Sequence, residues 1–164
     1  SGDVYKRQGE GHGKSTAAIG NAIRCASEGK SVIIIQFLKG KNENELAFLN
    51  RLEPEIKIFR FAKSDESFEE LSEQEQQEEA MNLRNGFNYG KKVVTTAACD
   101  MLILDEVLGV IDEKVVAPQE MQELFENKPD DMTLICTGRV LEDSIRPYAD
   151  EIYNIAPEKI RIDE

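Results

Sequence analysis

The sequence predicts a single α/β domain in which helices cover both faces of a mostly parallel sheet. Apolar runs rich in β-branched residues alternate along the chain with segments of helical periodicity, an order typical of parallel sheets with helical crossovers. A length of 164 residues allows one sheet between helices and is too short for a second core. No internal repeat or linker interrupts the pattern, so we expect one domain over residues 1–164.

The first helix and the first apolar strand carry the clearest patterns. Residues 14–28 place alanine, isoleucine and cysteine at helical spacing and end before Gly29, which suits a helix C-cap. Residues 31–37 contain an uninterrupted Val-Ile-Ile-Ile run, which predicts a parallel strand buried on both faces. The other expected helices cover 43–52, 67–98, 118–127 and 142–148, and the other expected strands cover 55–61, 101–104, 132–136 and 151–155.

The segment 72–79 has no apolar residue over about two helical turns, so it cannot be packed on the core all round. We expect a solvent-exposed helix face there, and the alternative is a loosely held lid beside a ligand. Two helix-capping boxes fit the sequence at the start of this stretch, Ser67 with Glu70 and Ser72 with Glu75.

The eight amino-terminal residues fit a buried central strand poorly. Val4 and Tyr5 are available for burial, whereas Lys6 and Arg7 carry charges that suit such a strand badly. The chain also lacks an initiating methionine. We therefore expect residues 1–8 to be truncated, processed or artefactual.

Composition and charge argue against several classes of function. A formal net charge of −12 repels polyanions, and no dense basic patch indicates a nucleic-acid partner. No apolar run approaches the roughly 18–20 residues that span a bilayer, and the amino terminus does not resemble a signal peptide. The three cysteines, Cys25, Cys99 and Cys136, are odd in number and widely spaced, as expected for reduced, mostly buried thiols in a cytoplasmic protein.

A glycine-rich basic segment at the start of the first helix is the strongest functional signal. It reads Gly9-Glu10-Gly11-His12-Gly13-Lys14-Ser15-Thr16. Backbone N–H groups of glycines and of a helix N-terminus can converge on phosphate oxygens, while Lys14 supplies a cation and Ser15 a hydroxyl for a metal ion. The full pattern has a glycine where Gln8 stands, and a chance glycine-rich turn that opens a helix is the alternative. We interpret the segment as a nucleotide-phosphate loop.

Two carboxylates follow the strand predicted over 101–104. Asp105 and Glu106 lie where a parallel sheet presents its ligand-binding edge. Mg²⁺ that bridges triphosphate oxygens takes one or two carboxylates and the loop hydroxyl, so Ser15, Asp105 and Glu106 are the candidate metal ligands. The alternative is a strand-terminal aspartate that acts as a turn or helix cap.

Three further basic residues are candidates for phosphate contacts. His12, the single histidine, lies inside the loop, where a position tolerant of most side chains is the simpler interpretation. Arg24 lies on the helix that follows the loop, and Arg139 follows a predicted strand in Thr137-Gly138-Arg139. Either arginine could reach a triphosphate, although surface arginines are usually solvated charges.

Five short blocks together resemble the P-loop type of the ATP:cob(I)alamin adenosyltransferase family. They are Gly9 to Ala18, Gln36-Phe37-Leu38-Lys39-Gly40, Leu104-Asp105-Glu106, Thr137-Gly138-Arg139 and Ala149-Asp150. The blocks run from about residue 9 to residue 155 in the family's order and spacing. A loop without its first glycine is itself typical of this family, and ordinary P-loop ATPases do not share the Gln36 to Gly40 block.

The resemblance implies a RecA-like sheet, often in a dimer, and transfer of the adenosyl group of ATP to a corrinoid. In this family the cobalt(I) of a reduced corrinoid attacks the 5′ carbon of ATP and the whole triphosphate leaves, so the protein stabilises a leaving group. An electron donor must reduce the corrinoid, and a flavoprotein reductase is the expected partner. By matching position, the triphosphate contacts are Lys14, Ser15, Thr16, Arg24 and Arg139, and the Mg²⁺ ligands are Ser15 and Glu106.

The stretch that covers the corrinoid departs from the family's pattern. Many members carry Phe-Thr-Trp there, whereas this chain has Phe59-Arg60-Phe61 and no tryptophan. Cobalt(I) forms readily only when the lower axial ligand has left, and bulky apolar side chains beneath the ring can enforce this. The resemblance therefore adds Phe61 to Lys14 and Glu106 as a catalytic candidate, with an ordinary core phenylalanine as the alternative.

Two other classes of function stay open. A P-loop kinase or ATPase would transfer the γ-phosphoryl group to an activated nucleophile or water, and Gln8 at the first glycine position argues against it. A non-catalytic nucleotide-binding module would bind ATP without turnover.

Overall fold

The computed structural model describes residues 4–8, 13–37, 48–139, 143–148 and 151–154, with the backbone alone at 4–8, 13–15 and 151–154. Within these residues, parallel strands form one six-stranded sheet in the order β3-β2-β4-β5-β1-β6. The predicted α/β class with a parallel sheet is therefore confirmed. The strands are β1 (Val4–Gln8), β2 (Val32–Gln36), β3 (Ile56–Arg60), β4 (Met101–Asp105), β5 (Thr133–Thr137) and β6 (Glu151–Asn154).

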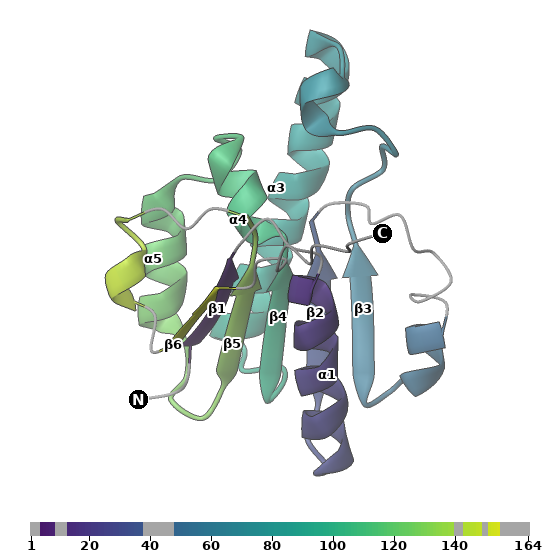
Figure 1. Ribbon diagram of the computed structural model, residues 1–164, viewed down its shortest axis with the longest axis vertical. Coiled ribbons are helices and arrows are strands. Elements are labelled where there is room, and N and C mark those ends of the chain that lie inside the picture. Colours follow the sequence, from purple (N-terminus) through teal and green to yellow (C-terminus); the bar gives the residue numbers. More distant parts are fainter. Residues whose placement is uncertain (1–3, 9–12, 38–47, 140–142, 149–150, 155–164) are drawn as a thin grey trace, which may run out of the picture.

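Helices cover both faces of this sheet (Figure 1). The helix α1 (Gly13–Ser27) lies on one face, and the opposite face carries α3 (Glu73–Thr95), α4 (Val107–Asp112) and α5 (Pro118–Asn127). Three short 3-10 turns complete the described elements: η1 (Asn50–Leu52), η2 (Phe68–Glu70) and η3 (Arg146–Tyr148).

Each face of the sheet carries one apolar cluster, and the strands contribute alternate residues to the two clusters. In β2, Val32 and Ile34 pack with α1, whereas Ile33 and Ile35 pack with the helices on the other side. Successive side chains of a strand point to opposite faces, so a strand covered on both sides needs apolar residues throughout. This explains the uninterrupted run that the sequence places in β2.

The ends of α1 and α3 agree with their capping residues. Gly29 follows α1 with a φ of +82°, the left-handed conformation that glycine adopts without strain. Ser72 caps α3, because its hydroxyl accepts from the backbone N–H of Glu75 and the Glu75 carboxylate accepts from the Ser72 N–H. These hydrogen bonds lower the pKa of Glu75. The expected box at Ser67 is wrong, since Ser67 precedes a 3-10 turn without a side-chain cap.

The amino-terminal turns of α3 project beyond the ends of the strands (Figure 1). Most of the polar segment 72–79 is exposed there, as expected for a solvated helix face. Glu79 is the exception, since its exposed fraction is 7%.

One predicted helix differs from the structure, a second lies mostly outside the described residues and is helical in its described part, and one helix was not predicted. The segment 142–148 ends in the 3-10 turn η3 where an α-helix was expected, because Pro147 lacks an N–H and disfavours helical geometry at the residue before it. Most of 43–52 lies outside the described residues, and η1 forms its last three positions. The helix α4 was missed because its six residues continue an apolar run too short to show a period.

Residues 4–8 form the strand β1 although Lys6 and Arg7 suit a buried central strand badly. It pairs with β5 on one side, where Val4 aligns with Leu134, and with β6 on the other. Backbone hydrogen bonds to two neighbours stabilise a parallel strand whatever its side chains. The strand that a phosphate loop requires is therefore present.

The three cysteines are buried free thiols, as the sequence predicts. Burial raises the pKa of Cys99 to about 12 and also raises the pKa of Cys25. Because the thiolate is the reactive form, both groups are poor nucleophiles in the folded chain.

Candidate active site

The glycine-rich segment connects the end of β1 to the start of α1. The strand ends at Gln8 and the helix begins at Gly13, so Gly13, Lys14, Ser15 and Thr16 occupy the first turn of α1. The loop residues Gly9, Glu10, Gly11 and His12 lie outside the described residues. In the sheet, β1 lies between β5 and β6, so the connection from β5 to β6 passes over β1. Points where the strand order changes in this way bind ligands at the carboxyl edge of parallel sheets.

A hydrogen-bonded group of three residues occupies this edge on the neighbouring strands. The hydroxyl of Thr137, at the end of β5, donates to Asp105 Oδ1 over 2.8 Å, and the backbone N–H of Glu106 donates to Thr137 Oγ1 over 2.8 Å. Thr137 is fully buried, and the exposed fraction of Asp105 is 7%. One hydroxyl thus fixes both the Asp105 carboxylate and the backbone that presents Glu106.

Glu106 adopts a backbone conformation that is costly for its residue type. Its φ is +64° at the N-cap of α4, where a residue with a Cβ is strained by about 1–2 kcal/mol. Such strain persists where surrounding contacts enforce it, and it is concentrated at functional sites. The Glu106 side chain is half-buried at the same edge of the sheet as the start of α1.

The glycine of Thr137-Gly138-Arg139 allows α4 to pack against the end of β5. A Cβ on Gly138 would lie 2.2 Å from Leu108 Cβ, which is closer than any real contact. Leu108 lies in the first turn of α4, two residues after Glu106. Gly138 therefore permits the helix position that sets the Glu106 backbone.

The polar edge continues across the sheet on the α1 face. In the strand register, Asp105 aligns with Gln36, and Gln36 aligns with Arg60. Arg60 Nε donates to Gln36 Oε1 over 3.1 Å, and the exposed fraction of Gln36 is 8%. Gln36 begins the block that resembles the adenosyltransferases, and the structure aligns it with Asp105 as adjacent strand ends, whereas residues 38–40 of the block lie outside the described residues.

Phe61 lies on the opposite face of the sheet, against α3. Its ring centroid is 5.9 Å from that of Tyr89, and the ring of Phe59 lies 4.8 Å from the same tyrosine. A Cβ on Gly86 would approach Phe61 Cδ2 to 3.1 Å, so this glycine lets the ring lie close to the helix. Phe61 is half-buried and packs against the core while keeping part of its ring exposed.

Glu79 holds the segment that follows Phe61, a role that sequence reasoning missed. Its two carboxylate oxygens accept from the backbone N–H groups of Lys63 and Ser64 over 2.9 and 2.6 Å, and Asn82 Nδ2 donates to it over 3.3 Å. A signal was available, because Glu79 lies four residues before the buried Leu83, on the inner side of α3.

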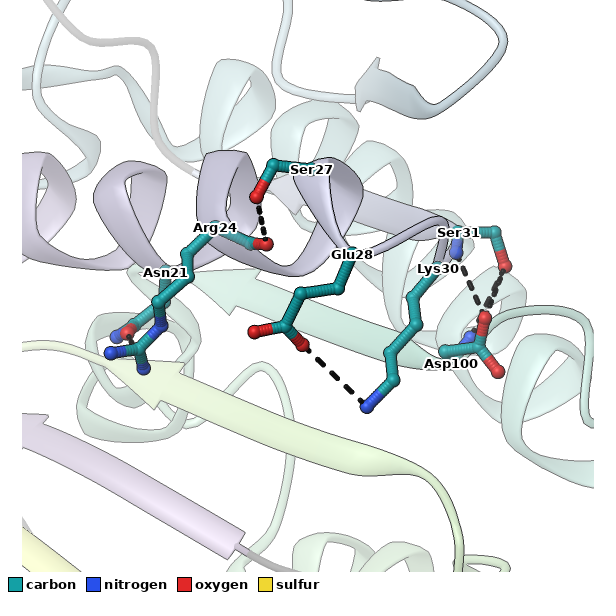
Figure 2. A network of polar contacts seen from close by, with 7 residues as sticks. All are labelled: Asn21, Arg24, Ser27, Glu28, Lys30, Ser31 and Asp100. Atoms are coloured by element: carbon teal, nitrogen blue, oxygen red, sulfur yellow. Dashed lines mark hydrogen bonds and ion pairs between the residues drawn. The ribbon is translucent and has the colours of Figure 1, made fainter.

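The two candidate arginines lie in different places. Arg139 is exposed directly after β5, at the edge where the loop begins. Arg24 is ten residues beyond Lys14, about 15 Å along the helix axis, and its Nη2 donates to Asn21 Oδ1 over 3.0 Å (Figure 2). The same view shows Ser31 bonded to Asp100 at the amino ends of β2 and β4. Arg24 therefore lies toward the end of α1 remote from the loop.

Comparison with known proteins assigns this arrangement to a family. A sequence model of the ATP:corrinoid adenosyltransferases BtuR/CobO/CobP matches residues 2–164. The chain belongs to this family. It is 28% identical to the corrinoid adenosyltransferase of Escherichia coli K12 over 155 residues, which cover 94% of the chain and 76% of that protein. It is 29% identical to the corrinoid adenosyltransferase CobA of Salmonella typhimurium with the same coverage.

A structural neighbour supports the RecA-like fold of this adenosyltransferase. The KaiC-like protein PH0186 of Pyrococcus horikoshii superposes with a TM-score of 0.66, covering 98% of the chain and 75% of the neighbour. Its sequence identity is 18%, so the likeness concerns the fold alone. Among the described helices, none combines the length and the apolar character needed to cross a bilayer.

Proposed function

We propose that the chain transfers the 5′-deoxyadenosyl group of ATP to the cobalt(I) of a reduced corrinoid and releases inorganic triphosphate. Family membership supports the reaction class. The observation that carries the proposal is the Thr137 hydroxyl, which joins Asp105 to the Glu106 backbone at the edge where α1 begins. This arrangement supports a site in which two carboxylates and a helix N-terminus bind a nucleotide triphosphate with its cation.

The first turn of α1 would bind the triphosphate both as part of ATP and after its bond to the adenosyl group has broken. Its backbone N–H groups have no partner within the helix, and the helix dipole favours negative charge at this end. Lys14 adds a full positive charge, and the hydroxyls of Ser15 and Thr16 add donors. Because charge develops on the leaving oxygen, these groups stabilise the transition state more than bound ATP. The loop residues Gly9, Glu10, Gly11 and His12 are proposed to complete the phosphate cradle.

The residues at the edge fit a Mg²⁺ ion. Oxygen ligands are those that Mg²⁺ prefers, and it commonly keeps several waters besides one or two carboxylates and phosphate oxygens. Among the described residues, no group of three or more His, Cys, Asp or Glu side chains is placed to hold a metal ion. We propose Asp105, Glu106 and Ser15 as its protein ligands, and triphosphate oxygens and waters would fill the other coordination positions. The ion would neutralise charge on the leaving triphosphate.

The two arginines are proposed to contribute unequally. Arg139 is exposed at the carboxyl edge next to the β1 loop and would contact the triphosphate directly. Arg24 lies about 15 Å from Lys14 along α1 and is bonded to Asn21. Its contribution to phosphate binding would therefore require its side chain to leave Asn21.

Phe61 is proposed to face the lower side of the corrinoid. It is half-buried after the end of β3, with Tyr89 and Gly86 fixing its ring and Glu79 fixing the backbone beyond it. A fixed apolar ring would disfavour a polar axial ligand at cobalt, because that ligand would lose its hydrogen bonds there. A flavoprotein reductase as electron donor, a homodimer and a cytoplasmic location complete the proposal.

The experiment that tests the reaction is a direct adenosylation assay. The chain is incubated with ATP, Mg²⁺ and a chemically reduced corrinoid under anaerobic conditions, and the visible absorption spectrum is followed. We expect conversion to the spectrum of an adenosylated corrinoid, which loses its adenosyl group on illumination. A spectrum that stays that of the reduced corrinoid, with ATP bound, would instead indicate a non-catalytic module.

A further inference from the structure

Arg60 ends β3 on the face of the sheet that α1 covers. In this strand Ile56 and Ile58 pack into the cluster around α1, and Arg60 continues their alternation. Strand register aligns it with Gln36, and Gln36 with Asp105. Strands are about 4.8 Å apart, so the Arg60 backbone lies about 10 Å from that of Asp105, along the same polar edge.

The Arg60 guanidinium is fixed on one side and unsatisfied on the other. Its Nε donates to Gln36 Oε1 over 3.1 Å. Its Nη2 is buried and has no hydrogen-bond partner within the part of the chain that the structure describes, and no ion pair to Arg60 is formed among those residues. A buried donor left unpaired destabilises the fold, and more so when it is charged, so this arrangement calls for a partner outside the described protein groups.

An oxyanion is the partner that fits this nitrogen. Arginine is always protonated and offers planar N–H donors that match phosphate and carboxylate oxygens.

We propose that Arg60 is a substrate-binding residue whose Nη2 takes an oxyanion of a substrate, either a phosphate of the nucleotide or a free carboxylate of the corrinoid. The inference rests on the proposed function, because that function supplies both substrates. The position of Arg60 suits a group beyond the phosphate loop, since β3 lies four strands, or about 19 Å, from β1. Gln36 acts as the positioning residue that orients the guanidinium.

The test compares Arg60→Met with the full wild-type chain and with Lys57→Met, a change of an exposed lysine on the same strand. One arm measures the dissociation constant of inorganic triphosphate by calorimetry. The other arm measures, also by calorimetry, the dissociation constant of a corrinoid with free carboxylate side chains and that of its fully amidated counterpart. A rise of at least tenfold for triphosphate assigns the oxyanion to phosphate. A tenfold rise confined to the carboxylate-bearing corrinoid assigns it to the corrinoid.

A change below tenfold in both arms overturns the proposal. The melting temperature of ligand-free Arg60→Gln gives a second readout, because this change removes the unpaired Nη2 while its amide can still donate to Gln36, so the temperature should stay unchanged or rise. A lowered melting temperature with unchanged binding would show a structural role. If Arg60→Met does not fold, Arg60→Gln is judged by the same limits, since it is neutral and can still bond to Gln36. Triphosphate binding needs no turnover. If the wild-type chain fails to adenosylate a corrinoid, the proposed function is contradicted, but the dissociation constants of the variants can still be compared.

Discussion

The hydroxyl of Thr137 donates to Asp105 Oδ1 over 2.8 Å, across the boundary between β5 and β4. The same oxygen accepts from the Glu106 N–H, so a single buried hydroxyl bonds to the last residue of β4 and to the residue that follows it. Its loss would leave a carboxylate oxygen and a backbone N–H with one partner fewer in a buried place.

Thr137→Val is therefore expected to lower the free energy of unfolding by about 1–3 kcal/mol and to lower kcat by roughly tenfold to a hundredfold, as misplaced catalytic groups do. Urea denaturation and the adenosylation assay measure the two effects. Thr137→Ser should restore both, and Thr133→Val, at the opposite end of β5, should leave kcat near wild type. A full kcat in Thr137→Val would mean that the hydroxyl serves stability alone.

Lys14→Ala should weaken ATP binding and abolish turnover while the fold is kept. Lys14 belongs to the first turn of α1, and its charge is proposed to act on the triphosphate. Removing one such charge-stabilising group typically costs about a hundredfold to a thousandfold in kcat. Lys30→Ala, just beyond the other end of α1, is the matched control. Wild-type turnover in Lys14→Ala, with an unchanged melting temperature, would remove the loop from the mechanism.

Glu106→Gln should lower Mg²⁺-dependent activity more than it lowers stability. The side chain is half-buried, and glutamine keeps its size while losing the charge that a divalent cation requires. The measurement is the Mg²⁺ concentration for half-maximal rate, which we expect to rise at least tenfold. Asp112→Asn, an exposed acidic residue of the same helix, should leave it unchanged. An unaltered metal dependence in Glu106→Gln would assign Glu106 to the folding of α4.

Phe61→Ala should slow the reaction with cobalt(II) corrinoid plus a reductant far more than the reaction with chemically pre-reduced cobalt(I). The reason is that the ring is proposed to help the lower ligand leave, a step that pre-reduced corrinoid has already passed. Phe59→Ala, which packs on the same Tyr89, is the control for packing. Equal losses in both assays would indicate ordinary core damage, for which phenylalanine truncation typically costs about 3–5 kcal/mol.

Local patterns predicted the elements whose physical cause is local. The periodicity before Gly29, the apolar run of β2 and the proline that opens α5 each act within a few residues, and each gave the right element. The helix α4 has only six residues, fewer than two turns, so periodicity could not separate it from the strand before it. The candidate ligands Asp105 and Glu106 were found because they end an apolar strand.

Features that depend on how two strands align, or on backbone groups far away in the sequence, could not be predicted from local patterns. The bond from Thr137 to Asp105 joins residues 32 positions apart and depends on how β4 and β5 align. Glu79 looked like any other member of a polar run, yet its partners are backbone groups 15 and 16 residues earlier. The free nitrogen of Arg60 is visible only once β3 and β2 are paired.

The central claim is that the whole triphosphate leaves ATP as one group, and identifying the phosphate product by chromatography tests it most directly. With ATP, Mg²⁺ and reduced corrinoid, we expect inorganic triphosphate in equal amount to the adenosylated corrinoid, and no phosphate product when corrinoid is omitted. This outcome follows from the proposed role of the groups around Lys14, which is to hold a leaving triphosphate, and no residue is assigned to activate water. ADP and phosphate formed with or without corrinoid would contradict the account and indicate γ-phosphoryl transfer.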